Sequence, residues 1–376
     1  MSTMLNPGTL RYNRFRSETG ADAAASPYAS ALAGRPVLIT GAGGYIGSAL
    51  AMALAAADPA RLLLLDSSEH NLFKIQQRLE AAYGHVPQEA VLGSVTDAEL
   101  LNRLFSRFRP SIVYHAAALK HVPLLELNPL AAVRHNALGT YALARAALHH
   151  GVPALVLVST DKAVNPHSIM GASKRLAELT MAALSGPQCR MNAVRLGNVI
   201  GSTGSVIPIF REQIARCAPV TVTHPEVSRY FMSLGEAVEA ILAAGAAQCA
   251  GRILLPALGE PERIADLARF LVAAAADGTG NEIPIRFIGL RPGEKLREDL
   301  IFQAETREGS TMGPLEVIVT PSPAPAELHS RMEQLASHIA GGDVAELIGT
   351  ISAMVPDYKP SSLILAAMDA CRSVGR

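Results

Sequence analysis

Residues 36–47 read PVLITGAGGYIG, and this stretch decides the fold. The apolar run predicts a buried strand, and Tyr45 begins a segment with the composition of a helix. Glycines at Gly41, Gly44 and Gly47 permit a tight turn, a close approach of the backbone to a pyrophosphate, and close packing of helix on strand. The N-terminus of the helix adds free N–H groups. The stretch therefore predicts a strand–turn–helix unit that binds a dinucleotide.

Short apolar runs alternate with longer helical segments on the C-terminal side of this unit. Apolar strands between helices predict a parallel sheet covered on both faces, and right-handed crossovers make such a sheet doubly wound. We therefore predict an α/β fold, a Rossmann-like doubly wound parallel sheet with a smaller interleaved α/β substrate domain. The predicted strands are 36–40, 61–65, 89–92, 111–115, 154–158 and 191–196, and the predicted helices are 45–57, 69–82, 97–107, 129–150 and 168–184.

The alternating pattern breaks up after residue 197, where glycine and proline become frequent. Short strands at 220–223, 252–255 and 283–288, with helices at 233–245 and 262–276, suggest a smaller domain interleaved with returns to the sheet. Residues 303–325 are polar and rich in proline, and a helical segment is predicted at 326–353. The predicted organisation is a flexible segment 1–34, a dinucleotide-binding Rossmann domain 35–198 with returns near 228–258, a mainly substrate-binding domain 199–302, and a C-terminal helical extension 303–376.

The composition excludes several classes of protein. Basic and acidic residues number 33 each, so no global field attracts nucleic acid or an anionic membrane. The four cysteines form no CxxC pair, which argues against a disulfide framework or a zinc site and predicts a cytoplasmic protein without a metal. Residues 1–34 lack the apolar core of a signal peptide, and the glycines within 36–57 argue against a membrane span.

Asp66 ends the second predicted strand, and its position favours NAD as the dinucleotide. A carboxylate there can accept both hydroxyls of the adenosine ribose and repels a 2′-phosphate, and no arginine adjoins it in DSSEHN. The alternative is a structural glycine turn with a surface aspartate. His115 ends another strand and can line the cofactor groove or pack in the core. The further candidate cofactor residues are Ile46, Ser67, Ser94, Val95, Ala116 and Ala117.

Residues 159–162, STDK, follow the apolar run ALVLV. They lie at the carboxyl end of a predicted strand, where doubly wound sheets bind their ligands. Met170 and Lys174 follow on one face of the next helix, one turn apart. We therefore expect chemistry at this edge of the sheet, although an ordinary loop with Asp161 and Lys162 as a surface pair is the alternative.

These motifs together resemble the extended short-chain dehydrogenases/reductases, and within them the UDP-N-acetylglucosamine 4,6-dehydratases of bacterial polysaccharide and glycan biosynthesis. Many of those dehydratases carry membrane helices before this domain, and this chain resembles a form without them. The motifs that carry the resemblance are the glycine pattern, HAAALKHVP at 115–123, STDKAVNP at 159–166, MGASKR at 170–175, RLGNVIGSTGSVIP at 195–208, HPEVSRYFM at 224–232, GLRPGEKL at 289–296 and VPDYKP at 355–360.

The resemblance implies a redox-neutral dehydration. NAD⁺ takes a hydride from C4 of the sugar, water is eliminated across C5 and C6, and the hydride returns to C6. Thr160 then hydrogen-bonds the C4 hydroxyl, Asp161 is the candidate acid at C6, and Lys162 is the candidate base at C5. Lys174 orients the nicotinamide ribose by the same resemblance.

Met170 departs from the superfamily pattern, which has a tyrosine at this position. A thioether has no exchangeable proton, so it cannot be the base for the C4 hydroxyl. Two readings remain open. Either Asp161, Lys162 or a water takes over that role, or the chain does not oxidise C4 in the usual way.

The resemblance also implies a set of residues that bind the UDP-sugar. Arg229 and Arg291 would contact the diphosphate through charge-assisted bonds, although lone arginines are usually solvated surface residues. Glu294 could accept the uridine ribose hydroxyls. Lys120 and His121 could reach the sugar or pair with the backbone. Asn198 and the backbone around Val206 and Ile207 could hold the sugar phosphate and the uracil edge, and Asn136 resembles the asparagine that braces the active-site helix.

Three functions remain open from the sequence. The first is an NAD-dependent UDP-N-acetylglucosamine 4,6-dehydratase. The second is a nucleotide-sugar 4-epimerase or another oxidoreductase on the same scaffold. The third, motivated by Met170, is a non-catalytic protein that binds NAD or a UDP-sugar. The superfamily usually dimerises through the helices predicted at 129–150 and 168–184, so a homodimer is also predicted.

Overall fold

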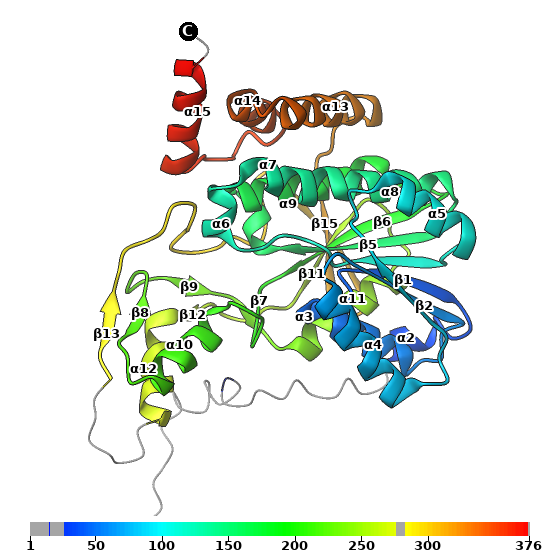
Figure 1. Ribbon diagram of the computed structural model, residues 1–376, viewed down its shortest axis with the longest axis horizontal. Coiled ribbons are helices and arrows are strands. Elements are labelled where there is room, and N and C mark those ends of the chain that lie inside the picture. The colour runs from blue at the N-terminus through cyan, green and yellow to red at the C-terminus, as the bar shows by residue number, and fades with distance from the viewer. Residues whose placement is uncertain (1–14, 16–25, 276–282, 375–376) are drawn as a thin grey trace, which may run out of the picture.

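The structure is a computed structural model that describes residues 15, 26–275 and 283–374 (Figure 1). A nine-stranded sheet in the order β14-β15-β11-β6-β5-β4-β1-β2-β3 forms the centre of this described part. The strands from β11 to β3 pair in parallel, which confirms the predicted Rossmann-like doubly wound sheet. The strands are β1 Pro36–Thr40, β2 Arg61–Asp66, β3 Gln88–Leu92, β4 Ile112–His115, β5 Ala154–Thr160, β6 Arg190–Leu196, β11 Ile253–Pro256, β14 Thr306–Met312 and β15 Leu315–Val319.

The order of the strands reverses between β1 and β4, and this switch point positions the site. In open α/β sheets a crevice forms where the chain leaves neighbouring strands in opposite directions. The strands β1, β4 and β5 are almost entirely buried, as near-continuous apolar runs in a parallel sheet should be. The polar residues at the carboxyl ends of these strands therefore lie together at one edge of the sheet.

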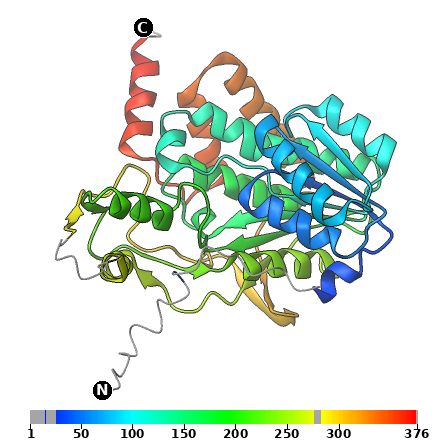
Figure 2. The same cartoon turned by 60° about the horizontal axis from the view of Figure 1, so that its bottom comes forward.

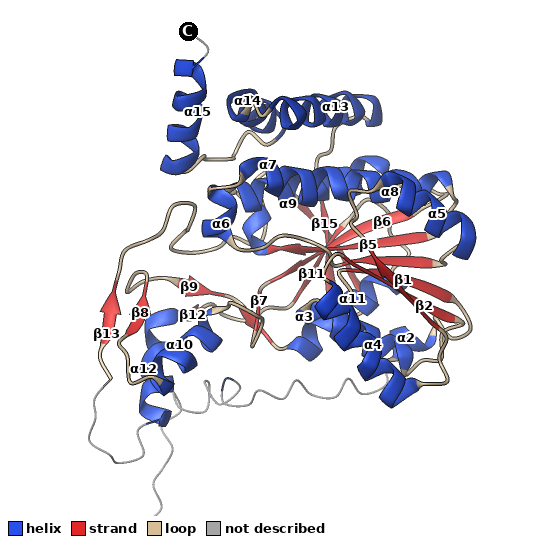
Figure 3. Ribbon diagram, viewed as in Figure 1, coloured by secondary structure: helices blue, strands red, loops and turns tan. Residues whose placement is uncertain are grey.

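Helices cover both faces of the sheet (Figure 3). Polar side chains cap several of them: Ser168 accepts from the N–H of Gly171 at 3.1 Å, and Asp97 accepts from the N–H of Leu100 at 2.9 Å. One face carries α5 Ala98–Phe108, α8 Gly139–His149 and α9 Ile169–Leu184, and the other carries α2 Pro27–Ser30, α3 Tyr45–Ala55, α4 Glu69–Tyr83 and α11 Leu234–Ala246.

Two stretches differ from the elements predicted before and after β1. Residues 27–30 form α2 within the segment expected to be flexible, and Ala29 is buried against the main core; residues 1–14 and 16–25 lie outside the described residues. The single helix predicted at 129–150 is divided into α7 Pro129–Ala132, a π-helical segment η2 Val133–Leu138, and α8. Hydrophobic periodicity does not reveal a π-helical turn, because the apolar residues continue through it.

The polar, proline-rich segment 303–325 was placed in a helical extension, but part of it forms strands. Residues 306–319 form the hairpin β14–β15, and β15 pairs antiparallel with β11 at the edge of the main sheet. Leu315 and Ile318 are fully buried there. The pairing partner lies more than 50 residues away in the chain, so local composition could not indicate it.

The C-terminal helices form a third layer over α9. These are α13 Pro325–Gly341 and α14 Val344–Met354, followed by α15 Ser362–Val374. Leu335, Leu347 and Ile351 have no exposed surface and pack in one apolar cluster with residues of η2 and α9. The helical face expected to dimerise is therefore covered by the chain itself. A homodimer stays a prediction, and a second copy cannot use this face without displacing α13 and α14.

A smaller lobe lies to one side of the main sheet in both views (Figure 2). Its apolar cluster includes Phe210, Val220 and Phe231, and its short strands pair in twos beside α10 and α12. No helix among the described residues combines the length and the apolar run that a bilayer crossing needs. The elements of this lobe are β7 Asn198–Val199, α10 Val206–Ala215, β8 Val220–Val222, β9 Ser228–Arg229, β10 Phe231–Met232, β12 Glu262–Arg263, α12 Ile264–Ala275 and β13 Ile285–Phe287.

Candidate functional site

The glycine turn between β1 and α3 has the geometry that the sequence predicted. Gly41 has φ 67°, and a Cβ on it would lie 2.7 Å from the backbone of Ala117. A Cβ on Gly47 would lie 2.0 Å from the carbonyl oxygen of Gly41, so only glycine lets α3 approach the strand. Gly44 is the N-cap of α3, and Tyr45 and Ile46 begin the helix half-buried.

The carboxylate of Asp66 is bonded to this turn. Its Oδ2 accepts from the N–H of Gly43 and its Oδ1 from the N–H of Ser68, both at 2.8 Å. Because Asp66 is nine-tenths buried at the carboxyl end of β2, the alternative of a surface aspartate is excluded. Ser67 is exposed beside it, and Ser94 and Val95 follow β3 at the same edge of the sheet. The Asp66 carboxylate therefore stabilises the conformation of the glycine turn through this hydrogen bond and is held beside it.

His115 packs in the core and has no exposed side-chain surface. Its Nδ1 lies 2.7 Å from Oγ1 of Thr40 and its Nε2 lies 2.9 Å from Oγ1 of Thr140. Burial, with a smaller contribution from the Lys174 ammonium, lowers the pKa of His115 to about 3. The imidazole is thus a neutral connection between β1, β4 and α8. The chain continues to the half-buried Ala116 and Ala117, whose backbone lies against Gly41 of the glycine turn.

Thr160, Asp161 and Lys162 form one hydrogen-bonded group where β5 ends and the short helix η3 Asp161–Ala163 begins. Oγ1 of Thr160 donates to Oδ1 of Asp161 at 3.0 Å, and Nζ of Lys162 donates to the same oxygen at 2.9 Å. Asp161 is fully buried, and its Oδ2 has no hydrogen-bond partner among the described residues. Because the carboxylate has no exposed surface, the alternative of a surface pair does not hold.

Lys162 makes a second contact that crosses to the smaller lobe. Its Nζ also donates to Oδ1 of Asn198 at 2.9 Å, and its side chain is 23% exposed. Asn198, predicted to hold the sugar phosphate, therefore touches the predicted base instead. Its own strand β7 is held by pairing with β10, which gives the amide a fixed position.

Lys174 and Met170 lie one turn apart on α9, and both are buried. Nζ of Lys174 donates to the carbonyl of Val158 at 2.8 Å. Burial lowers the pKa of Lys174 to about 8, and the Glu178 carboxylate opposes this shift. The thioether of Met170 belongs to the apolar cluster of α9, α13 and α14. Met170 thus fills space where a proton-bearing group would otherwise stand.

Asn136 connects the loop that follows β4 to α9, the active-site helix that its resemblance implied it would brace. Its Oδ1 accepts from the N–H of Leu119 at 2.9 Å, and its Nδ2 donates to the carbonyl of Leu119 and to Oγ of Ser173, each at 3.0 Å. Asn136 lies in the π-helical segment η2, a kind of segment frequent at functional sites. The neighbouring Lys120 and His121, at the start of α6 Val122–Glu126, keep exposed surface. Partial desolvation lowers the pKa of both groups, and the Lys120 ammonium lowers the pKa of His121 further.

The structure brings the predicted UDP-sugar residues together only in part. Arg229 is buried, and its guanidinium donates to the carbonyls of Ser228, Lys295 and Leu296 at 2.7–3.2 Å. A contact with a diphosphate would require these bonds to be exchanged. Arg291 is exposed and donates to the carboxylate of Glu294. Ile207 is buried in the lobe's apolar cluster, and Val206 begins α10.

Sequence reasoning missed Glu298 and Lys295, which lie beside the predicted base. Nζ of Lys295 lies 2.8 Å from Oε2 of Glu298 and donates to the carbonyl of Val164 at 3.0 Å. The positive charges of Lys162, Arg229 and Lys295 lower the pKa of Glu298 against the effect of its burial. The only sequence signal was an alternation of charges in GEKLRED, which is usual for solvated loops.

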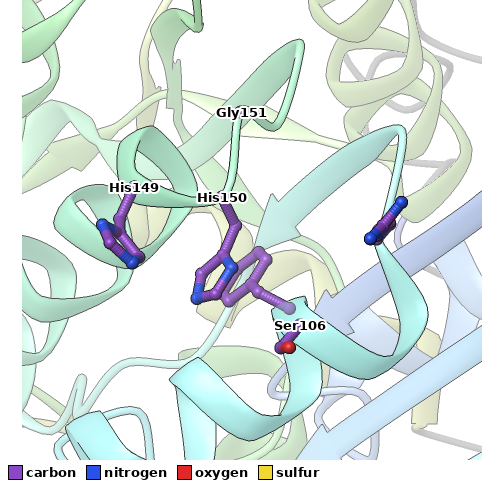
Figure 4. A pocket seen from close by; sticks show the side chains of 6 residues that line it. Ser106, His149, His150 and Gly151 are labelled. Carbon is purple, nitrogen blue, oxygen red and sulfur yellow. The ribbon is translucent and has the colours of Figure 1, made fainter.

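A groove of about 900 Å³ lies elsewhere, between α5 and α8. A second pocket, of about 490 Å³, adjoins it, and Ser106, His149, His150 and Gly151 are part of its lining (Figure 4). No predicted site residue lines either pocket. His149 and His150 lie at the C-terminus of α8, where basic side chains are commonly found because they complement the helix dipole. Among the described residues no group of three or more His, Cys, Asp or Glu could hold a metal ion.

Comparisons with known proteins agree with this architecture. Residues 37–319 match the family described as "Polysaccharide biosynthesis protein". The capsular polysaccharide biosynthesis protein CapD of Staphylococcus aureus is 43% identical over 277 residues, 73% of this chain and 46% of CapD, so the chain spans about half the length of that relative. The UDP-glucose 4-epimerase of Rickettsia typhi is 31% identical over 287 residues, 74% of this chain and 81% of the epimerase.

Two solved structures share the fold. Pen from Bacillus thuringiensis superposes with a TM-score of 0.70 at 28% identity, over 78% of this chain and 89% of Pen. The UDP-glucose 4-epimerase of Thermus thermophilus, solved in complex with NAD, superposes with a TM-score of 0.58 at 25% identity, over 71% of this chain and 90% of the epimerase. The chain is therefore an extended short-chain dehydrogenase/reductase that belongs to the polysaccharide biosynthesis protein family, as its motifs predicted.

Proposed function

We propose that the chain is an NAD-dependent nucleotide-sugar 4,6-dehydratase, a lyase that converts a UDP-N-acetylhexosamine, in the first instance UDP-N-acetylglucosamine, into the UDP-4-keto-6-deoxy sugar. One observation carries the proposal. Thr160, Asp161 and Lys162 are joined by hydrogen bonds of 2.9–3.0 Å, and the carboxylate between them is fully buried with one oxygen unpaired among the described residues. An acid and a base in one buried pair suit an elimination, which needs both at once.

NAD fits the residues at the carboxyl ends of β1 and β2. The crowded glycine turn leaves the backbone uncovered by side chains at the start of α3, where free N–H groups favour a pyrophosphate. Asp66 stands beside that turn as an acceptor for ribose hydroxyls. When bound, NAD would supply a reversible hydride acceptor for C4 and donor for C6. The buried Lys174 would orient the nicotinamide ribose.

Lys162 has a geometry that suits proton abstraction. Two of its N–H bonds point to Oδ1 of Asp161 and to Oδ1 of Asn198, each at 2.9 Å. In the amine form these two acceptors use both N–H groups and leave the lone pair in the third direction. Asn198 would therefore restrain the Lys162 side chain and direct the lone pair of its amine toward C5.

The protons balance over the proposed cycle. The proton of the C4 hydroxyl passes through Oγ1 of Thr160 to Asp161, and the resulting carboxylic acid protonates the C6 hydroxyl, which leaves as water. The amine of Lys162 takes the C5 proton during this elimination and returns it to C5 afterwards. Both groups end as they began, so the buried Met170 needs no acid–base function. Asp161 then takes over the role of the missing tyrosine.

The nucleotide side of the proposed site is formed by loop residues. Arg291 and Glu294 bind each other across an exposed loop, and their contact would be exchanged for contacts with the diphosphate and the uridine ribose. Lys120 and His121 lie on the same side, on the loop that Asn136 braces. This arrangement suits a UDP-sugar better than a nucleic-acid polymer, because it offers few basic side chains and they lie on short loops.

The test is incubation of the protein and NAD⁺ with UDP-N-acetylglucosamine in D₂O, followed by NMR. A 4-keto-6-deoxy sugar with deuterium at C5 is the expected product, because the N–H groups of Lys162 exchange with solvent. Conversion to the C4 epimer with the C6 oxygen retained would instead identify an epimerase, the second candidate, which the Rickettsia typhi relative favours. Binding of both ligands without any conversion would reject both enzymes.

A further inference from the structure

Two arginines and two glutamates form a buried ion cluster behind the strand end that carries Thr160. Its members are Arg175 and Glu178 on α9, Arg195 on β6, and Glu305 just before the hairpin. Their side chains are 0–8% exposed. The proposed reaction uses none of these residues. Arg175 and Arg195 stand in the motifs at 170–175 and 195–208, which gave them no role, and Glu178 lies outside the motifs.

The cluster is neutral, and its hydrogen bonds are complete. Arg195 donates to Glu178 at 2.9 and 2.8 Å, to Glu305 at 2.6 and 2.7 Å, and to the carbonyl of Leu300 at 3.1 Å. Those bonds use all five N–H groups of a guanidinium. Arg175 adds a donor to each carboxylate at 3.0 Å. A buried network with every member satisfied is rigid, whereas a partly satisfied one is destabilising.

One bond connects this cluster to the proposed catalytic residues. Oγ of Ser159 donates to Oε1 of Glu178 at 2.8 Å, and Ser159 immediately precedes Thr160. Ser159 also lies opposite Arg195 in the register of β5 with β6. The last residue of β5 that faces α9 is therefore tied to the cluster through its side chain as well as its backbone.

The cluster also holds the end of the segment that leads from the smaller lobe. The carbonyl of Leu300 accepts from Arg195, and the N–H of Phe302 donates to Glu305 at 2.9 Å. Upstream in the same segment lie Lys295 and Glu298, beside the loop that follows Lys162. The catalytic loop and the segment 289–305 thus share one rigid anchor.

We propose that Glu178 is a positioning residue, which acts through Ser159 to hold Thr160, Asp161 and Lys162 in place against the segment 289–305. The inference rests on the proposed function for its catalytic consequence. Supporting hydrogen bonds of this kind set the orientation of groups in contact with substrate, and a displacement of about 1 Å in such groups can cost about a hundredfold in rate.

The test uses the full chain with three substitutions. Ser159→Ala removes the bond and leaves the ion cluster intact, and Ser159→Thr restores a hydroxyl. Thr180→Ala is the matched control. Thr180 is buried on α9, the helix of Glu178, and within the described part of the chain its hydroxyl bonds only to the carbonyl of Leu176. Turnover, KM for UDP-N-acetylglucosamine and hydrogen–deuterium exchange of the peptide 159–165 are measured for each.

We expect Ser159→Ala to lower kcat about ten- to a hundredfold with KM little changed, to speed exchange in peptide 159–165, and to be rescued by Ser159→Thr. Thr180→Ala should change neither kcat nor the exchange of peptide 159–165. Unchanged exchange, or faster exchange with unchanged kcat, would overturn the positioning role. If the wild type makes no product, the proposed function fails on its own, and faster exchange in Ser159→Ala would still support the anchoring of the loop.

Discussion

Nζ of Lys162 and Oδ1 of Asp161 lie 2.9 Å apart, with the carboxylate fully buried and the lysine side chain 23% exposed. The buried partner can thus reach solvent protons only through its neighbours, whereas the amine lies at the mouth of the site. This difference in exposure suits the proposed roles. Asp161 would receive its proton from the substrate, whereas Lys162 can exchange protons with water.

Replacing Asp161 by asparagine should abolish elimination while keeping the shape of the site. The amide cannot protonate the C6 hydroxyl, and general acid catalysis typically contributes about 10²–10⁴-fold. We expect formation of the 4-keto-6-deoxy sugar, followed by NMR, to fall by about that factor. A variant that still forms the 4-keto-6-deoxy sugar at the wild-type rate would contradict the role of Asp161 as the acid of the elimination.

Thr160→Val should slow the first oxidation, because its side chain has the same shape but cannot pass a proton to Asp161. The expected result is slower appearance of NADH absorbance in a single turnover, with NAD⁺ affinity unchanged. Thr160→Ser should recover the rate. Equal rates in the valine and wild-type proteins would show that the C4 proton takes another route.

Met170→Leu tests whether the thioether has a chemical role. The swap conserves volume in an apolar cluster, so stability should fall by less than about 1.5 kcal/mol in urea unfolding. Turnover should stay within a few-fold of the wild type. Loss of activity in a stably folded variant would mean that the sulfur itself, rather than apolar bulk, is needed at this position.

Asp66→Asn should weaken NAD⁺ binding about ten- to a hundredfold, since hydrogen bonds to a charged acceptor contribute about 1.5–3 kcal/mol. Titration calorimetry measures the change. Asp58→Asn is the matched control, because Asp58 is exposed and its carboxylate bonds only to His85 among the described residues. An equal loss of affinity in both variants would contradict a contact between Asp66 and the cofactor.

His115 should make the fold sensitive to acid. Its pKa in the fold is about 3, below the ordinary 6.5, so between these values the unfolded chain binds more protons than the folded one. Stability should therefore fall as the pH drops from about 6.5 towards 3, by up to about 1.4 kcal/mol per pH unit from this group. His115→Asn should be less stable at neutral pH. Its free energy of unfolding, measured with urea at several pH values, should also depend less on pH than that of the wild type. An unchanged dependence on pH would contradict the neutral, buried imidazole.

Much of the Rossmann core could be predicted from local patterns. The first strand and the glycine turn match the structure closely, and so does the position of Asp66, because each depends on the conformation of a few neighbouring residues. The strand end at 159–162 was predicted for the same reason. Apolar periodicity and glycine spacing report local backbone geometry directly.

The partners of polar side chains could not be predicted in this way. His115 was a candidate for the groove and packs in the core, and Arg229 was a candidate for the diphosphate and bonds to carbonyls of a segment more than 60 residues away. The lysine–asparagine contact of the site, between Lys162 and Asn198, was missed for the same reason. Each depends on which loops the sheet brings together.

By itself the sequence determined the order of strands and helices in the Rossmann core, the dinucleotide turn and the family, because these depend on short-range geometry and on motifs in order along the chain. Only the tertiary structure decided that 306–319 joins the sheet, that α13 and α14 cover α9, and that Glu178, Arg195 and Glu305 meet. Those contacts join residues far apart in the sequence, such as Arg195 and Glu305, which are 110 positions apart. Their energies depend on burial and complete pairing, which exist only after the chain has folded.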